Sequence, residues 1–196
     1  MKYILLMLAS LLTFTAAAQF ENLVPGLVMS AKDGDGCTVK FCDTCKTIPV
    51  RFIGIDAPEI RGYSLEAQPY GNMAGDTLRS WIKGRVLLFY TLSLKGTGQR
   101  DYYGRLIAEP YFPDTSSVCF ALVKGGWAWA VSVSERRHKG FNRVLEKEME
   151  EAKAAKRGLW RSYIKGDGGV ARILKPGTWR KNKSVKNKKL WKTNIK

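Results

Sequence analysis

The sequence predicts a mainly β domain with added helices, an α+β fold around one core. Stretches rich in β-branched and aromatic residues, such as 50–55 and 86–92, are typical of strands. Residues 70–83 place apolar side chains at helical spacing, and residues 141–157 are rich in Glu, Lys and Ala; each stretch is followed by a glycine, as helices often are. Hydrophobic residues make up 45% of the 196-residue chain, as in a globular protein.

Both ends of the chain are predicted to lie outside this domain, which we expect to span residues 19–162. Residues 1–18 combine a basic start, an apolar run and small residues before a cleavage site after Ala18, which is typical of a signal peptide. We therefore expect a secreted or periplasmic protein, with an uncleaved membrane anchor as the alternative. Residues 163–196 begin with a glycine-rich linker and become strongly basic, so we expect a disordered tail.

The first part of the domain is expected to bring acids together. A strand should precede the turn Asp33-Gly34-Asp35-Gly36, and a second strand, 38–41, should return through a hairpin into the strand at 50–55. If these last two strands are antiparallel neighbours, Asp33 and Asp35 lie at the start of one and Asp56 at the end of the other. Three carboxylates at one end of a sheet repel one another, and a cation would relieve that repulsion.

The stretch Val50–Glu59 carries the parts of a phosphodiester-cleaving site. Arg51 interrupts the apolar strand, and Pro58 ends it between two acids, Asp56 and Glu59. One carboxylate can bind a hard divalent ion, another can take a proton from water, and a guanidinium can bind phosphate. An ordinary turn with a surface ion pair is the alternative interpretation.

The second half of the domain should contain two more strands and a short apolar element. A strand is expected at 100–108, where Arg105 follows an Asp, two tyrosines and a glycine. Residues 118–123 form either a helix or a strand, and the alternation in 127–131 predicts a half-buried strand.

The cysteines leave more than one interpretation open. The four are Cys37, Cys42, Cys45 and Cys119. A bridge between Cys42 and Cys45, or between one of them and Cys37, is compatible with an exported chain. A zinc site formed by all four is the competing interpretation, although there is only one Cys-x-x-Cys pair.

The net charge of +16, with a pI near 9.8, indicates a polyanionic partner. Nucleic acid is the first expectation and an anionic membrane surface the second.

Five motifs in order make the chain resemble the staphylococcal nuclease (thermonuclease) family from about Leu27 to Trp160. They are Asp33-Gly34-Asp35, Arg51–Glu59, Gln68-Pro69-Tyr70-Gly71, Asp101–Arg105 and Ala155–Trp160. The resemblance implies an OB-fold, a five-stranded Greek-key barrel with three helices and the active site beside it.

The resemblance also implies roles for individual residues. Asp35, Asp56 and the backbone carbonyl of Ala57 match the family's calcium ligands, and Asp33 matches an acid close to them. Glu59 matches the general base, and Arg51 and Arg105 match the two arginines that hold the scissile phosphate. At the positions of the family's base-stacking tyrosines this chain has Ser132 and Ser134. The aromatic residues that could stack on bases instead are Tyr102, Tyr103 and Trp129. Of these, Tyr102 and Tyr103 are our predicted substrate-binding residues.

The resemblance implies calcium-dependent endonucleolytic hydrolysis of DNA and RNA with 3′-phosphate products, and since the sequence contains no base-reading motif we expect low sequence specificity. The rival hypothesis is a non-catalytic OB-fold protein that binds nucleic acid through its basic and aromatic residues. A membrane-surface protein is a third and less favoured possibility. We expect a monomer without a specific protein partner.

Overall fold

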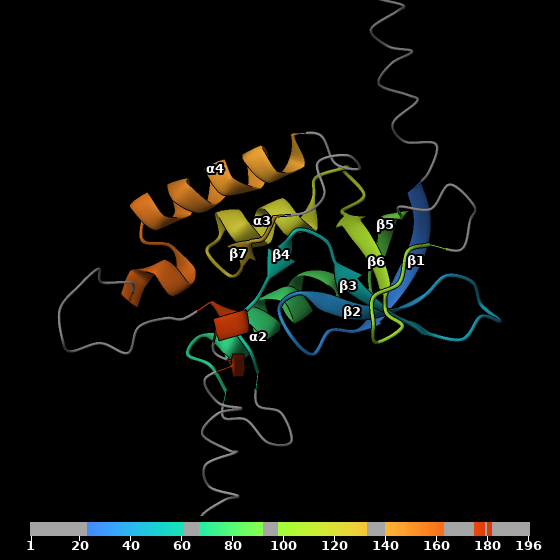
Figure 1. Ribbon diagram of the computed structural model, residues 1–196. Coiled ribbons are helices and arrows are strands. Elements are labelled where there is room, and N and C mark those ends of the chain that lie inside the picture. The colour runs from blue at the N-terminus through green and yellow to red at the C-terminus, as the bar shows by residue number, and fades with distance from the viewer. Residues whose placement is uncertain are drawn as a thin grey trace, which may run out of the picture.

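A closed five-stranded barrel forms the centre of the computed structural model, which describes residues 23–60, 67–91, 98–132, 140–162, 175–178 and 180–181. The strands follow one another around the barrel in the order β1-β2-β3-β6-β5 (Figure 1). Their bounds are β1 Leu23–Ser30, β2 Gly36–Lys40, β3 Ile48–Phe52, β5 Val86–Thr91 and β6 Leu106–Tyr111. The predicted α+β fold with an OB-type barrel is therefore confirmed.

All neighbouring strands are antiparallel except β3 and β6, which are parallel. Within each strand, alternate side chains point into the barrel, because successive residues of a strand face opposite sides. Val50 and Phe52 of β3 are buried, whereas Arg51 between them is only partly buried and faces outward. The strand therefore contributes both to the core and to the outer surface.

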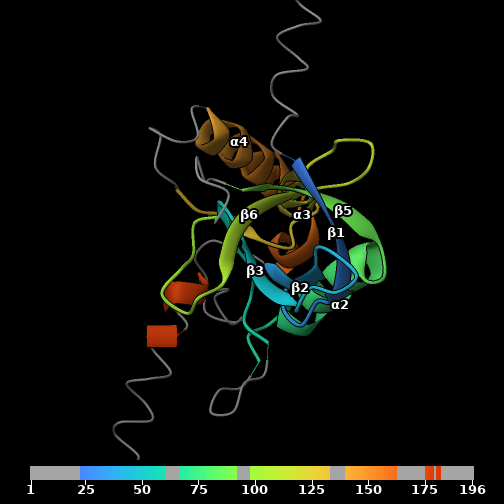
Figure 2. The ribbon, with the colours of Figure 1, turned by 90° about the vertical axis from the view of Figure 1, so that its right-hand side faces the viewer.

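Three α-helices in the described part of the domain lie around the barrel, as expected. They are α2 Gly71–Ile82, α3 Val118–Lys124 and α4 Phe141–Ala154, and α4 is followed by the 3-10 turn η1 Gly158–Ser162. Helices α3 and α4 pack together, and α2 lies apart from this pair in both views (Figures 1 and 2). A second, two-stranded sheet pairs β4 Ile55–Asp56 with β7 Trp129–Ala130.

Three predicted strands differ in the structure. The strand expected at 50–55 ends at Phe52, and after a turn at 53–54 the next strand is β4. The strand expected from residue 100 begins at Leu106, because the Asp101 carboxylate accepts hydrogen bonds from the backbone N–H groups of Tyr103 and Arg105, both at 2.9 Å. Such side-chain bonds hold the backbone in a turn and compete with a strand. In 127–131, only Trp129 and Ala130 pair with another strand.

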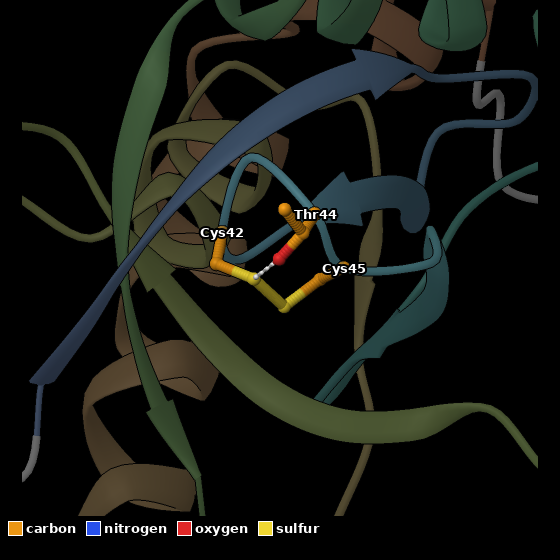
Figure 3. Close-up of a disulfide and its surroundings, with 3 residues drawn as sticks. All are labelled: Cys42, Thr44 and Cys45. Carbon is orange, nitrogen blue, oxygen red and sulfur yellow. Dashed lines mark hydrogen bonds between the residues drawn. A yellow bond between two sulfur atoms is a disulfide. The ribbon is translucent and has the colours of Figure 1, made fainter.

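One disulfide joins Cys42 to Cys45 in the turn between β2 and β3, with the two Cα atoms 5.1 Å apart (Figure 3). Thr44 Oγ1 lies 3.6 Å from the Cys42 sulfur within the same turn. Cys37 and Cys119 are buried and unbridged. The alternatives of a bridge to Cys37 and of a four-cysteine zinc site are therefore wrong.

Several predictions from the sequence fall on residues outside the described ranges. These are the signal peptide at 1–18 and most of the basic tail, from which the structure describes only 175–178 and 180–181. Among the helices of the described ranges, none has the length and apolar character needed to cross a membrane.

Candidate active site

The site is built around the guanidinium group of Arg51, which joins two acids from separate segments. Arg51 lies on β3 directly opposite Gly36, the first residue of β2, so its side chain reaches the turn that carries Asp35. Its Nη1 forms an ion pair with Asp35, and its Nη2 donates to Asp56 Oδ1 at 2.9 Å. Nη2 also donates to the Ile55 carbonyl at 3.0 Å. The predicted meeting of Asp35 and Asp56 at one end of the barrel is thus present.

Close packing holds the turn that carries Asp35. The Asp35 side chain is nearly buried, and its Oδ2 accepts a hydrogen bond of 2.9 Å from the backbone N–H of Ala57. A Cβ atom at Gly34 would lie 2.7 Å from the Ala57 Cβ, and one at Gly36 would lie 2.8 Å from the Val50 carbonyl oxygen. The glycines of the Asp-Gly turn therefore allow the close approach that brings Asp35 to Ala57.

The acids around Arg51 are crowded and partly removed from water. Burial, together with the charge of Asp35, raises the pKa of Asp33 to about 6. Burial also raises the pKa of Asp56, although the charge of Arg51 acts in the opposite direction. Neighbouring carboxylates with raised pKa values ionise reluctantly, and a bound cation would stabilise their ionised forms.

The donor set fits a hard divalent ion such as calcium, which prefers oxygen ligands. The carboxylates of Asp35 and Asp56 both reach one guanidinium, and the peptide of Ala57 lies next to Asp35. In the described part of the chain, no cluster of three or more His, Cys, Asp or Glu side chains has the arrangement of a metal site. The predicted ligand set is smaller than such a cluster, with two carboxylates and one carbonyl.

Glu59 is held in place through its backbone by the motif at 68–71. The Gln68 N–H donates to the Glu59 carbonyl at 2.8 Å, and the Glu59 N–H donates to Gln68 Oε1 at 3.1 Å. At Gly71, a Cβ would lie only 2.1 Å from the Glu59 carbonyl oxygen, so this position requires glycine. The motif at 68–71 has no role that its sequence reveals; in the structure it holds the backbone of the predicted base.

Arg105 lies one residue before β6, the strand whose Ile107 pairs with Arg51 in the parallel ladder. The Arg105 Nε donates to Asp101 Oδ2 at 2.7 Å, so its guanidinium is paired with Asp101. In the described structure, each of the two predicted phosphate-binding arginines is thus paired with acids of its own, Arg51 with Asp35 and Asp56 and Arg105 with Asp101.

Two exposed tyrosines stand next to Arg105. The side chains of Tyr102 and Tyr103 are 97% and 79% exposed, and their rings meet edge to face with centroids 5.5 Å apart. The Arg105 guanidinium lies 5.6 Å from the centre of the Tyr103 ring. Trp129, the other candidate for stacking on bases, is buried and packs on Trp160, so that alternative is wrong.

The C-terminal segment adds a residue that the sequence analysis did not connect with the site. Arg180 Nη1 bonds Glu59 Oε1, and its Nη2 lies 3.3 Å from Asp56 Oδ2. Arg180 is 121 residues from Glu59 in sequence. No local pattern could have revealed this contact, because a basic tail offers many equivalent arginines and lysines.

Comparisons with known proteins find relatives that are named endonucleases. A family model described as "Staphylococcal nuclease homologue" matches residues 49–162. A protein of Escherichia coli named "Uncharacterized endonuclease" is 32% identical over 139 residues, which cover 70% of this chain and 77% of that protein. Two Bacillus subtilis proteins are also 32% identical. The match to the SPbeta prophage-derived endonuclease YokF covers 71% of this chain and 45% of YokF, and the match to endonuclease YncB covers 64% of this chain and 57% of YncB.

Removing the central guanidinium should destabilise the fold. We expect Arg51→Met to lower the free energy of unfolding by about 3 kcal/mol, because the nearly buried carboxylates of Asp35 and Asp56 lose their counter-charge. Urea unfolding at neutral pH without divalent ions measures this loss. Arg105→Met is the matched control and should lose less than about 1 kcal/mol, since its ion pair is more exposed. Equal losses in both variants would contradict the central role of Arg51.

Proposed function

Because the chain belongs to the staphylococcal nuclease family and is accordingly a nuclease, we propose that it is a calcium-dependent endonuclease acting on both DNA and RNA. On this proposal it hydrolyses phosphodiester bonds with low sequence specificity and leaves 3′-phosphate ends. The observation that carries the proposal is the meeting of Asp35 and Asp56 at the Arg51 guanidinium, with Glu59 following on the same loop.

A phosphodiester resists attack because its own negative charge repels nucleophiles, and charge on its oxygens grows in the transition state. Fixed cationic groups stabilise that growing charge more than they stabilise the ground state. Arg51 lies on β3 and Arg105 just before β6, two strands that pair in parallel, and both arginines are proposed to bind the oxygens of the scissile phosphate. Arg105 would exchange Asp101 for the phosphate when substrate binds.

Glu59 is the proposed general base. Its carboxylate would take the proton of the attacking water while the 5′ oxygen leaves, which gives the 3′-phosphate product. The hydrogen bonds from Gln68 fix the main chain of Glu59, so its carboxylate extends from a backbone position that is fixed relative to Asp56. Such positioning is required because a general base acts only within hydrogen-bonding distance of the proton that it removes.

Asp35, Asp56 and the Ala57 carbonyl are the proposed calcium ligands, with Asp33 beside them. When bound, calcium would supply positive charge to the phosphate oxygens. The nearly buried carboxylates support this proposal, because acids near a phosphate site repel the substrate unless a metal neutralises them. A protein that only bound nucleic acid would gain nothing from these acids, which disfavours the rival hypothesis of a non-catalytic binder.

Low specificity is proposed because the exposed aromatic groups beside the site can stack on any base. Tyr102 and Tyr103 present their rings to solvent next to Arg105. Stacking of this kind tolerates every base and favours unpaired strands. The net charge of +16 supports attraction to the phosphate backbone of either nucleic acid. We further propose that the protein acts as a monomer.

The direct test is digestion of a plasmid and of an RNA with calcium, with magnesium and with chelator, followed by end-group analysis. We expect cleavage of both substrates with calcium, 3′-phosphate ends, and no cleavage with chelator. Cleavage that persists in excess chelator would contradict the metal requirement. Binding without cleavage under every condition would support the non-catalytic alternative.

Two substitutions test the proposed residue roles. Glu59→Gln should lower the cleavage rate about 10²-fold or more by removing the base, and Arg105→Ala should lower it about 10²-fold by removing a phosphate ligand. Both proteins should keep their circular dichroism spectra and most of their affinity for nucleic acid. Glu146→Gln and Arg143→Ala, at exposed positions of α4, are charge-matched controls that should cleave normally. Full activity in both site variants would refute the assignment.

Export is a separate proposal that rests on the sequence of residues 1–18. Expression in a bacterial host should yield an extracytoplasmic protein whose N-terminal sequence begins at Gln19. Recovery of a cytoplasmic protein that still carries Met1–Ala18 would contradict it.

A further inference from the structure

The contact between Arg180 and the site lies between two residues to which the proposed function gives essential roles. The guanidinium bonds Glu59 with one nitrogen and lies 3.3 Å from Asp56 Oδ2 with the other. The C-terminal segment that carries Arg180 also contains a short helical turn at 176–178, drawn in red in Figure 1, in which Pro176 is buried. A buried proline indicates that this part of the tail packs against protein, which supports a defined position for the arginine that follows.

Arg180 completes the occupation of the Asp56 carboxylate. Oδ1 already accepts a hydrogen bond from Arg51 at 2.9 Å, and Oδ2 faces Arg180. Both oxygens of a proposed metal ligand are therefore engaged by guanidinium groups. The positive charge of these guanidinium groups opposes a cation at Asp56, and Arg180 is the easier of the two to displace because its side chain is 49% exposed, compared with 20% for Arg51.

The same contact occupies the proposed base. Arg180 Nη1 donates a charge-assisted hydrogen bond to Glu59 Oε1, so this oxygen is already engaged and must be released before it can accept a hydrogen bond from the attacking water. The exposure of the Glu59 side chain, at 27%, keeps this bond within reach of solvent and of competing ions. The ion pair between Arg180 and Glu59 can therefore be broken by a competing ion.

We propose that residues 175–178 and 180–181 act as an intramolecular inhibitor of the site, in which Arg180 competes with the divalent cation for Asp56 and Glu59. This inference rests on the proposed function, because it assigns a form of regulation to that same site. A nucleic-acid backbone releases the segment, since its phosphates offer Arg180 and the neighbouring Lys175 and Lys181 a stronger anionic partner. Substrate binding and opening of the metal site are then coupled.

The inhibition is expected to be moderate. Ion pairs between partly exposed groups contribute little individually, and tethering within one chain strengthens them by keeping the partners close. We therefore expect removal of the Arg180 guanidinium to tighten calcium binding by about two- to tenfold. A much larger effect would require a fully buried contact, which the exposure of Arg180 excludes.

The test compares calcium affinity in the full chain, the Arg180→Gln variant and the Lys181→Gln control, by calorimetric titration with calcium chloride in the absence of nucleic acid. Lys181 carries the same charge on the next residue, so the control removes the general effect of lowering the net charge. Arg180→Gln should bind calcium about two- to tenfold more tightly than both other proteins. Equal affinity in all three, an equal shift in the two variants, or no calcium binding in any of them would overturn the proposal.

Cleavage assays on the same three proteins separate this inference from the proposed function. Active proteins with equal calcium affinities would disprove the inhibitory contact and leave the nuclease assignment intact. Inactive proteins in which Arg180→Gln still binds calcium more tightly would support the contact and disprove the catalytic proposal.

Discussion

The ion pairs of Arg51 with Asp35 and Asp56 are the interaction on which the geometry of the site depends. They join the turn before β2 to the end of β4, two segments that the barrel brings together through the pairing of β2 with β3. A slip of one residue in that pairing would turn Arg51 into the core and bring Val50 or Phe52 to the surface. The register that buries the apolar side chains is therefore also the register that assembles the acids.

Helix α2 supports the same region by packing its small residues against both acid-bearing segments. Ala74 is buried, a Cβ at Gly75 would lie 2.8 Å from the Lys32 carbonyl, and Gly71 is similarly pressed against the Glu59 carbonyl. Larger side chains would push the helix away and loosen both segments at once. Precision at the site thus comes from backbone contacts that only glycine and alanine allow.

Apolar periodicity was sufficient to predict most of the strands and the helices α2 and α4, and the pairing of adjacent strands predicted that Asp35 and Asp56 meet at one end of the sheet. It left residues 118–123, which lie in α3, open between helix and strand. It failed where a side chain competes with the backbone, as Asp101 does at the start of β6. It also gave no role to Gln68, whose importance lies in two hydrogen bonds to Glu59 that exist only after folding. The approach of Arg180 is a long-range contact, for which the sequence contains no signal.

The charge of the protein creates a conflict that the site must resolve. A chain with a net charge of +16 attracts nucleic acid, but its many lysines and arginines also compete for any cluster of exposed carboxylates in the same molecule. Asp35 is nearly buried, and in the described structure its only ion pair is with Arg51. The more accessible Asp56 and Glu59 also form ion pairs with Arg180. The acids nearest to solvent are thus the ones that the protein's own cations reach. A polyanion that draws those cations away would expose the acids at the moment when a substrate is present.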